Sequence, residues 1–130
     1  MPNTLRELKA ELFKVLANPV RVALLDELRS GPLTVGDLQR KLGIDSSNVS
    51  QHLAILRGRL LVTTRRDGNN VWYSVEEPRV YEILDAARAI LENQLALGRR
   101  LLKEQPHTPA STPKRSETSG TAARSAKNRI

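Results

Sequence analysis

The chain has 130 residues, of which 39% are hydrophobic and 27% are charged, and it contains no cysteine. This length and composition are typical of one soluble globular domain, and the lack of cysteine excludes disulfides, thiolate metal ligands and thiol redox switches. The longest apolar runs are only a few residues, whereas a membrane-spanning helix needs about 20. The first residues alternate charged and apolar side chains, unlike a signal peptide. We therefore expect a cytoplasmic protein without membrane contact.

The net charge is +7, from 21 basic and 14 acidic residues. A positive balance of this size favours an anionic partner, most often a nucleic acid. Residues 39–72 and residues 103–130 each contain six Lys or Arg against two Asp or Glu. A basic tail that only solubilises an ordinary domain is the alternative interpretation. That alternative does not explain the first basic region, which lies within the predicted folded part.

Periodic apolar residues predict two helices in the first thirty residues. Residues 4–17 begin with Thr4 followed three residues later by Glu7, which is the spacing of a capping box. Pro19 ends this pattern and suits the first turn of a second helix. The second helix is expected to bury Val20, Val22, Ala23, Leu25 and Leu28.

Two further helices around the sequence LGIDSS predict a helix-turn-helix. Thr34 suits the N-cap of the first, a short helix, and Gly43 is a good stop at its end. The second begins at a polar cap and ends near residues 57–59. The candidate caps are Asp45, Ser46 and Ser47. The apolar set expected on the inner face is Val49, Leu53, Ile55 and Leu56.

The segments LLVTTRR and VWYSV are rich in β-branched and aromatic residues, which predicts a two-stranded hairpin. Between them, Asp67-Gly68 is a hairpin-turn dipeptide. A long last helix is predicted over residues 79–102, about 36 Å in length. Residues 103–130 are rich in Pro, Ser, Thr, Lys and Arg, so we expect a disordered basic tail. The folded domain is accordingly placed at residues 1–102.

The polar face of the second motif helix suits the major groove of DNA, where Gln pairs with adenine and Ser donates or accepts. The alternative is that its serines and Asn48 only cap the helix, which leaves Ser50 and Gln51 unexplained. Arg65 and Arg66 near the hairpin tip suit phosphate or minor-groove contact, with a solvated turn as the alternative. The candidate DNA-binding residues are Gln39, Ser46, Ser47, Asn48, Ser50, Gln51, His52, Arg57, Arg65, Arg66 and Asn69.

Three segments resemble the ArsR/SmtB family of small bacterial winged-helix repressors: FKVLANPVRVALLDEL, VGDLQRKLGIDSSNVSQHLAIL and RRDGNNVWYSV. The resemblance covers about residues 8–95. It implies a mainly α winged helix-turn-helix with a small β-hairpin wing. It also implies a homodimer, joined through the first and last helices, that binds a palindromic operator in double-stranded DNA and represses transcription. The dimer residues expected on these helices are Leu5, Leu8, Leu12, Val80, Ile83, Leu84, Ala87, Ile90 and Leu91.

The family's two common metal sites are not retained in this chain. One uses a Cys-x-Cys pair on the short third helix, and the other uses Asp, His, His and Glu on the last helix. The corresponding positions hold Thr34 and Gly36 for the first site, and Glu77, Arg79, Ile90 and Asn93 for the second. We expect no standard metal site and no cofactor, and His52 is expected to be structural or phosphate-contacting. An oxygen-ligated ion or an unidentified effector ligand is left open.

A second departure from the family lies between the recognition helix and the first wing strand. The family usually has a small residue followed by glycine there, whereas this chain has Arg59 and Leu60. The sequence therefore suggests that Gly58 makes the turn.

Three other functions compete with a sequence-specific regulator. A non-sequence-specific nucleic-acid binder would use the basic wing and tail, and an interaction module would have lost its DNA contacts. An enzyme is disfavoured because the chain has two histidines, no cysteine and no glycine-rich phosphate loop.

Overall fold

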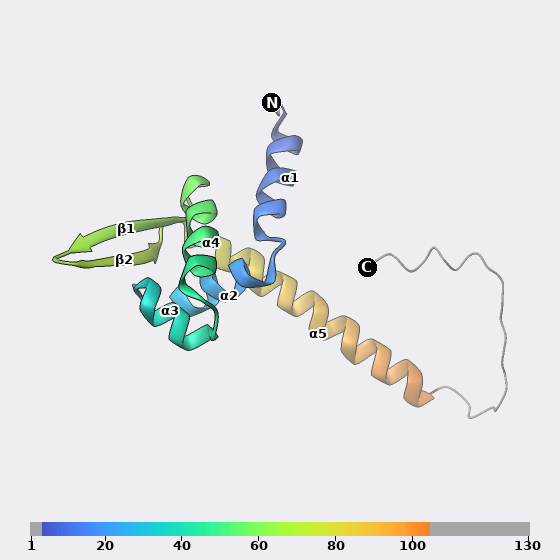
Figure 1. The fold of residues 1–130 in the computed structure, drawn as a ribbon. Helices are drawn as coiled ribbons and strands as arrows, with labels where there is room; N and C mark the ends of the chain where they lie inside the picture. Colours follow the sequence, from blue (N-terminus) through green and yellow to red (C-terminus); the bar gives the residue numbers. More distant parts are fainter. Residues whose placement is uncertain (1–3, 105–130) are drawn as a thin grey trace. The chain divides into compact units, whose positions relative to one another are not determined.

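The computed structural model describes residues 4–104, as five helices and one hairpin (Figure 1). The elements are α1 (Leu5–Leu16), α2 (Pro19–Leu28), α3 (Val35–Leu42), α4 (Ser46–Gly58), β1 (Val62–Asp67), β2 (Asn70–Val75) and α5 (Val80–Glu104). This order confirms the predicted winged helix-turn-helix, with a last helix that begins one residue later and ends two residues later than expected. The tail predicted from residue 103 overlaps the end of α5, and from residue 105 it lies outside the described residues. Two compact units meet within α5, between Ala86 and Ala87, and each is described by itself.

Local hydrogen bonds at the helix starts explain why the first three helices begin where they do. Thr4 and Glu7 form the predicted capping box on α1, and Thr34 forms a second one on α3 with Asp37. The Asn18 side chain accepts from two backbone N–H groups at the start of α2. Each cap satisfies donors that a helix start leaves unpaired, which stabilises it by about 1 kcal/mol.

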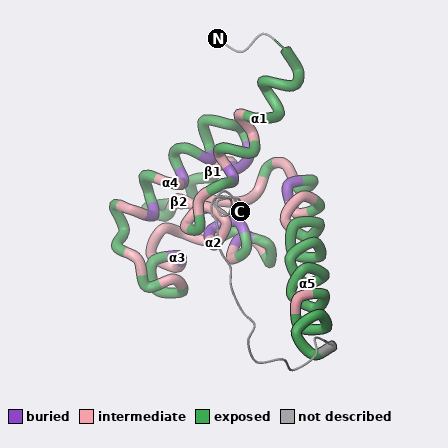
Figure 2. Tube along the Cα trace, turned by 90° about the vertical axis from the view of Figure 1, so that its right-hand side faces the viewer, coloured by how far each residue is buried: buried purple, intermediate pink, exposed green. Residues whose placement is uncertain are grey.

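The core of the first unit is aliphatic and is built mainly from α2, α3 and α4 (Figure 2). Leu24, 0% exposed, is a central member that the sequence interpretation missed, while Val20, Val22 and Ala23 are only partly buried. Helix α2 is apolar at most positions, so its periodicity could not identify the inner face. The core residues are Leu16, Leu24, Leu25, Leu28, Leu38, Val49, Leu53, Leu56, Leu61, Val62 and Val80.

Strands β1 and β2 pair antiparallel from Val62 opposite Val75 to Asp67 opposite Asn70. The two loop residues are therefore Gly68 and Asn69, and Asp67 belongs to the strand. Gly68 has φ +65°, and Asn69 is not in the left-handed region, which is the pattern of a type II′ turn. The predicted hairpin is confirmed, but Gly68 takes the first loop position that Asp67 was expected to hold.

The junction between α4 and β1 differs from the sequence expectation. Gly58 is the last residue of α4, and Leu60 makes the turn with φ +63°. A left-handed backbone costs a non-glycine residue roughly 1–2 kcal/mol. The Leu60 side chain is 76% exposed, so burial there offsets little of that cost.

The second unit contains the remainder of α5, from Ala87 to Glu104. Its large apolar side chains are exposed: Ile90, Leu91, Leu95, Leu97, Leu101 and Leu102. Among residues 4–104, no helix is long and apolar enough to cross a membrane.

Candidate nucleic-acid interface

Helix α4 has one face held in the core and an opposite face open to solvent. Val49, Leu53 and Leu56 are 0% exposed and pack α4 on α2 and α3. Ser47 and Gln51 are one helical turn apart on the opposite face, and both are exposed. A helix fixed in this way presents its polar face without further ordering, which suits insertion into the major groove of DNA. This face, marked by Ser47 and Gln51, is called the reading face below.

The remaining candidates on α4 divide between its two flanks. Ser46, Ser50 and Arg57 follow one flank and are exposed, whereas Asn48 and His52 follow the other and are partly buried. Ser50, expected beside Gln51 on the reading face, therefore lies toward the edge of that face. Gln39 is exposed on α3.

Ile55 is 39% exposed, which corrects its assignment to the core. It lies one turn after Gln51, at the edge of the exposed face. It lies two residues after Leu53 and one before Leu56, which is not the spacing of three or four that joins the core positions, so its apolar character alone led to the wrong assignment.

Asp45 caps α4, which decides among the three predicted caps. Its carboxylate accepts from the Ser47 hydroxyl at 2.6 Å and from the Asn48 backbone N–H at 3.2 Å. Two hydrogen bonds lower the pKa of Asp45: the one from the Ser47 hydroxyl has the larger effect, and the one from the Asn48 N–H has the smaller effect. Because the Ser47 hydroxyl donates to Asp45, it presents its oxygen lone pairs, and not its proton, to a DNA base.

The register of the wing separates its two arginines. Arg65 is opposite Trp72, and Arg66 is opposite Val71. Neighbouring residues in a strand point to opposite faces, so Arg66 shares a face with the buried Val62, and Arg65 lies on the other face. Both arginines and Asn69 are exposed. The two side chains therefore leave opposite sides of the wing.

The wing is anchored to the loop before α3. The backbone N–H and carbonyl of Tyr73 hydrogen-bond to those of Leu33, at 2.8 and 3.0 Å. This isolated bridge connects β2 to the helix-turn-helix beside it. The base of the wing is thereby held, while its tip remains exposed.

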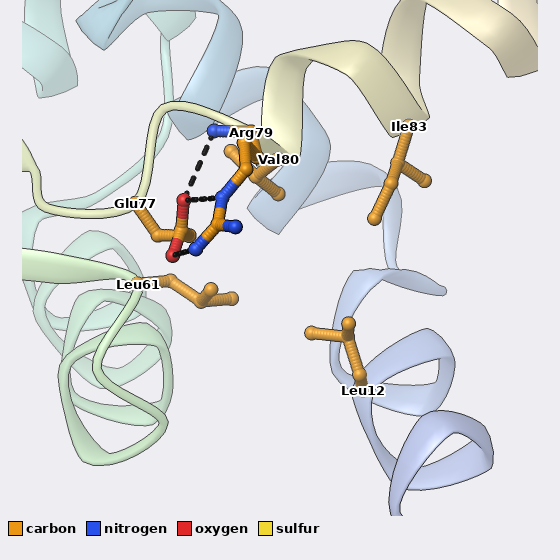
Figure 3. A pocket seen from close by; sticks show the side chains of 6 residues that line it. All are labelled: Leu12, Leu61, Glu77, Arg79, Val80 and Ile83. Carbon is orange, nitrogen blue, oxygen red and sulfur yellow. Dashed lines mark hydrogen bonds and ion pairs between the residues drawn. The ribbon is translucent and has the colours of Figure 1, made fainter. Parts of the chain in front are cut away.

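A cavity of about 220 Å³ lies among α1, the start of β1 and the first turn of α5 (Figure 3). Leu12, Leu61 and Ile83 contribute to its apolar wall, and Glu77 and Arg79 form an ion pair beside it. Arg79 donates from Nε and Nη2 to the two carboxylate oxygens, both at 2.8 Å. These hydrogen bonds lower the pKa of Glu77 to about 2.

Two carboxylates that could ligate a metal ion are engaged in ion pairs. Glu77 is engaged by Arg79, and Asp85 accepts from Arg29 at 3.0 and 3.3 Å. Among residues 4–104, no group of three or more His, Asp or Glu side chains could hold a metal ion. His52 has its ring nitrogen Nδ1 3.1 Å from Arg21 Nη1, which gives it a contact within the fold.

The expected dimer residues differ widely in exposure. Leu5 is 70% and Leu8 50% exposed, whereas Val80 is 2% exposed and belongs to the core of its own chain. Val80 is thus corrected from a surface position to a core position, because the first turn of α5 packs inward. Phe13, which the sequence interpretation did not include, is 54% exposed on α1. Leu12, Ile83 and Leu84 are partly buried, and Ala87, Ile90 and Leu91 are exposed.

Comparison with known proteins gives the family. A profile described as a helix-turn-helix domain matches residues 16–65. The uncharacterized HTH-type transcriptional regulator Rv0081 of Mycobacterium tuberculosis is 43% identical over 93 residues, 71% of this chain and 82% of that protein. Its crystal structure matches with a TM-score of 0.66, covering 73% of this chain and 96% of that one. The chain belongs to the ArsR/SmtB family of transcriptional regulators.

Two other solved structures are similar to this chain. The transcriptional repressor BigR of Xylella fastidiosa matches with a TM-score of 0.57 and 32% identity, over 68% of this chain and 88% of that one. The winged helix-turn-helix of Mb0332 from Mycobacterium bovis, described as homodimeric, shares the fold at 24% identity and a TM-score of 0.61, over 72% of this chain and 91% of that one. ArsR/SmtB proteins regulate transcription, which agrees with the prediction that the chain is not an enzyme.

Proposed function

We propose that this ArsR/SmtB protein is a homodimeric repressor that binds a palindromic operator in double-stranded DNA. The observation that carries the proposal is the exposed Ser47–Gln51 face of α4, opposite three fully buried core residues. BigR, a relative at 32% identity, is a transcriptional repressor, which supports repression as the mode of regulation. Binding to chromosomal DNA would place its action in the cytoplasm.

In this proposal the residues divide between base reading and backbone contact. Gln51 would read a base edge, with Ser47 as an acceptor and Ser50 at the margin of the groove. Arg57, Gln39 and one of the two wing arginines would contact phosphate or sugar, because these side chains are exposed around the reading face. The remaining candidates at the helix start and wing tip, Ser46, Asn48 and Asn69, would contribute polar contacts to the backbone.

The dimer is supported by apolar surface that a single chain leaves open. Leu5, Leu8 and Phe13 are at least half exposed on α1, and Ile90 and Leu91 are each 58% exposed on α5. A soluble monomer rarely exposes so many large apolar side chains. A two-fold dimer would present two copies of α4 to half-sites roughly 34–36 Å apart.

The test begins with DNA that co-purifies with the full-length protein from its own cells. Sequencing that DNA gives a candidate operator, which is compared with a scrambled duplex in a binding titration at near-physiological salt. The proposal predicts binding of one dimer to the operator, with much weaker binding to the scrambled DNA. Light scattering on the free protein measures the dimer directly.

A non-sequence-specific nucleic-acid binder is the second candidate, favoured by the basic residues between positions 39 and 72. Binding through phosphates alone would be similar for both duplexes and would fall steeply with salt. Equal affinities for operator and scrambled DNA would therefore select this alternative.

A further inference from the structure

One guanidinium joins three helices beside the reading face. Arg21, in the first turn of α2, donates from Nε to the backbone carbonyl of Val15 and from Nη1 to His52 Nδ1 at 3.1 Å. Its Nη2 lies 3.5 Å from the carbonyl oxygen of Lys14. The C-terminal end of α1 is thereby connected to His52 on the recognition helix.

We propose that Arg21 is a positioning residue for DNA binding. It holds His52 as the tautomer that carries its proton on Nε2, and this N–H donates to a backbone phosphate of the DNA. The inference rests on the proposed function, because it assumes that α4 lies in the major groove.

The tautomer follows from the chemistry of the two side chains. A guanidinium has five N–H donors, no acceptor, and stays protonated in proteins. Nδ1 of His52 must therefore be the acceptor in the contact with Arg21. A neutral imidazole has a single N–H, so the proton is on Nε2, which points away from Arg21 across the ring.

The position of His52 suits a phosphate contact better than a base contact. It follows Gln51 directly and shares the flank of α4 with Asn48, one turn earlier. Half or more of the hydrogen bonds in protein–DNA complexes go to phosphate and sugar, and they fix the orientation of the protein on the duplex. His52 is partly exposed, and the contact with Arg21 engages its Nδ1.

Arg21 is itself held before DNA arrives. Asn18 accepts from the backbone N–H of Arg21 at 3.1 Å, and two carbonyls at the end of α1 receive the guanidinium. Because these contacts form on folding, binding does not have to order the His52 ring. Preorganisation of this kind lowers the entropic cost of association.

Two substitutions at His52 separate its two nitrogens. His52→Asn places an amide near Nδ1, which can still accept from Arg21, but it removes the donor at Nε2. His52→Gln reaches the Nε2 position and keeps a donor there. We expect His52→Asn to weaken binding about tenfold or more on both operator and scrambled DNA, since it removes a hydrogen bond to a charged group. His52→Gln keeps the donor but loses the acceptor for Arg21, so it should weaken binding less than His52→Asn and about as much as Arg21→Ala. His52→Asn should keep the thermal midpoint of the wild type.

Arg21→Ala tests the positioning role. It should weaken binding in the wild-type background but add little in the His52→Asn background, where the phosphate donor is already absent. Equal losses in both backgrounds would show that Arg21 acts through the fold and would overturn the proposal. If Arg21→Ala does not fold, the proposal is tested by the two His52 variants and by nitrogen-15 spectra of the His52 ring in the wild-type protein.

Nitrogen-15 spectra of the wild-type His52 ring give one readout that a purely structural contact would not predict, which is a shift of the Nε2–H signal on DNA binding. The expected result is a proton on Nε2, with Nδ1 unprotonated, both free and bound to DNA, and a shift of the Nε2–H signal on binding. A proton on Nδ1, no shift of Nε2, or full affinity in His52→Asn would overturn the inference. If the wild-type protein bound operator and scrambled DNA equally, the proposed function would be overturned instead. The contact of His52 with phosphate could still be measured on scrambled DNA.

Discussion

At the scale of single residues, exposure separates side chains of α4 that look alike in the sequence. Gln51 is exposed on the face opposite the core, His52 is held by Arg21, and Ile55 lies at the edge of the open face. Three residues within one helical turn of each other thus have different environments. Substitutions at these positions are expected to have different effects on DNA binding.

Gln51→Ala should weaken operator binding by roughly 1–3 kcal/mol and relax the preference at one base pair in each half-site. The physical reason is that a glutamine amide offers a donor and an acceptor together, which alanine lacks. Binding titrations against operators altered at single positions measure this. Unchanged preference at every position would show that α4 docks differently from the orientation proposed.

Leu60→Gly should stabilise the fold by about 1 kcal/mol, since glycine adopts φ +63° without the steric cost that leucine bears. The side chain is 76% exposed, so its removal loses little burial. Thermal or denaturant unfolding measures the gain, and Leu60→Ala is the matched control because it keeps the backbone cost. A gain of the same size in both variants would assign the effect to the lost side chain.

At the scale of elements, the wing is a two-stranded ribbon whose faces differ. Val62 joins the core from one face, and the hairpin is fixed at its base by the Leu33–Tyr73 bridge. Arg65 and Arg66 leave opposite faces because they are adjacent in β1. A DNA backbone on one side of the wing is therefore contacted by one of them more closely than by the other.

Arg65→Ala and Arg66→Ala should accordingly have unequal effects. The arginine that meets a phosphate should, when removed, weaken operator and scrambled DNA alike and reduce the salt slope by about 1. The other substitution should leave the slope nearly unchanged. Arg88→Ala on α5, outside the basic region, is the matched control. Equal slope changes for both wing variants would contradict the register argument.

At the scale of the whole molecule, the structure describes the chain as far as Glu104. For the last 26 residues, disorder is a prediction from their composition. A chain truncated after Glu104 should keep its thermal midpoint and its dimer, because this segment has almost no large apolar residue to bury. Its DNA affinity should fall at low salt through the loss of basic charge. A large drop in the thermal midpoint would show that the segment packs on the domain.

Metal regulation through the usual sites of the family is not expected. Glu77 is paired with Arg79, and Ile90 and Asn93 stand where imidazole and carboxylate ligands would be needed. Calorimetric titration of the full-length protein with zinc and with nickel should give no submicromolar binding. Tight binding coupled to release of the operator would refute this and point to an unrecognised site, with His52 and α1 as the first places to look.

The sequence by itself determined the order of the elements, the capping boxes, the hairpin and the family resemblance. These features depend on short-range spacing: a cap and its partner three residues later, or a period of two or of three and four. That is why Thr4 with Glu7 and Thr34 with Asp37 could be read directly from the chain.

Only the tertiary structure decided which apolar and polar residues meet. Leu24 could not be placed because several apolar positions of α2 compete for one inner face, and packing against neighbouring helices selects among them. The contact between Arg21 and His52 joins residues 31 positions apart, which no local pattern specifies. The left-handed turn at Leu60 likewise arises because α4 and β1 are both fixed in the core, so that the residue between them must adopt the conformation that connects them.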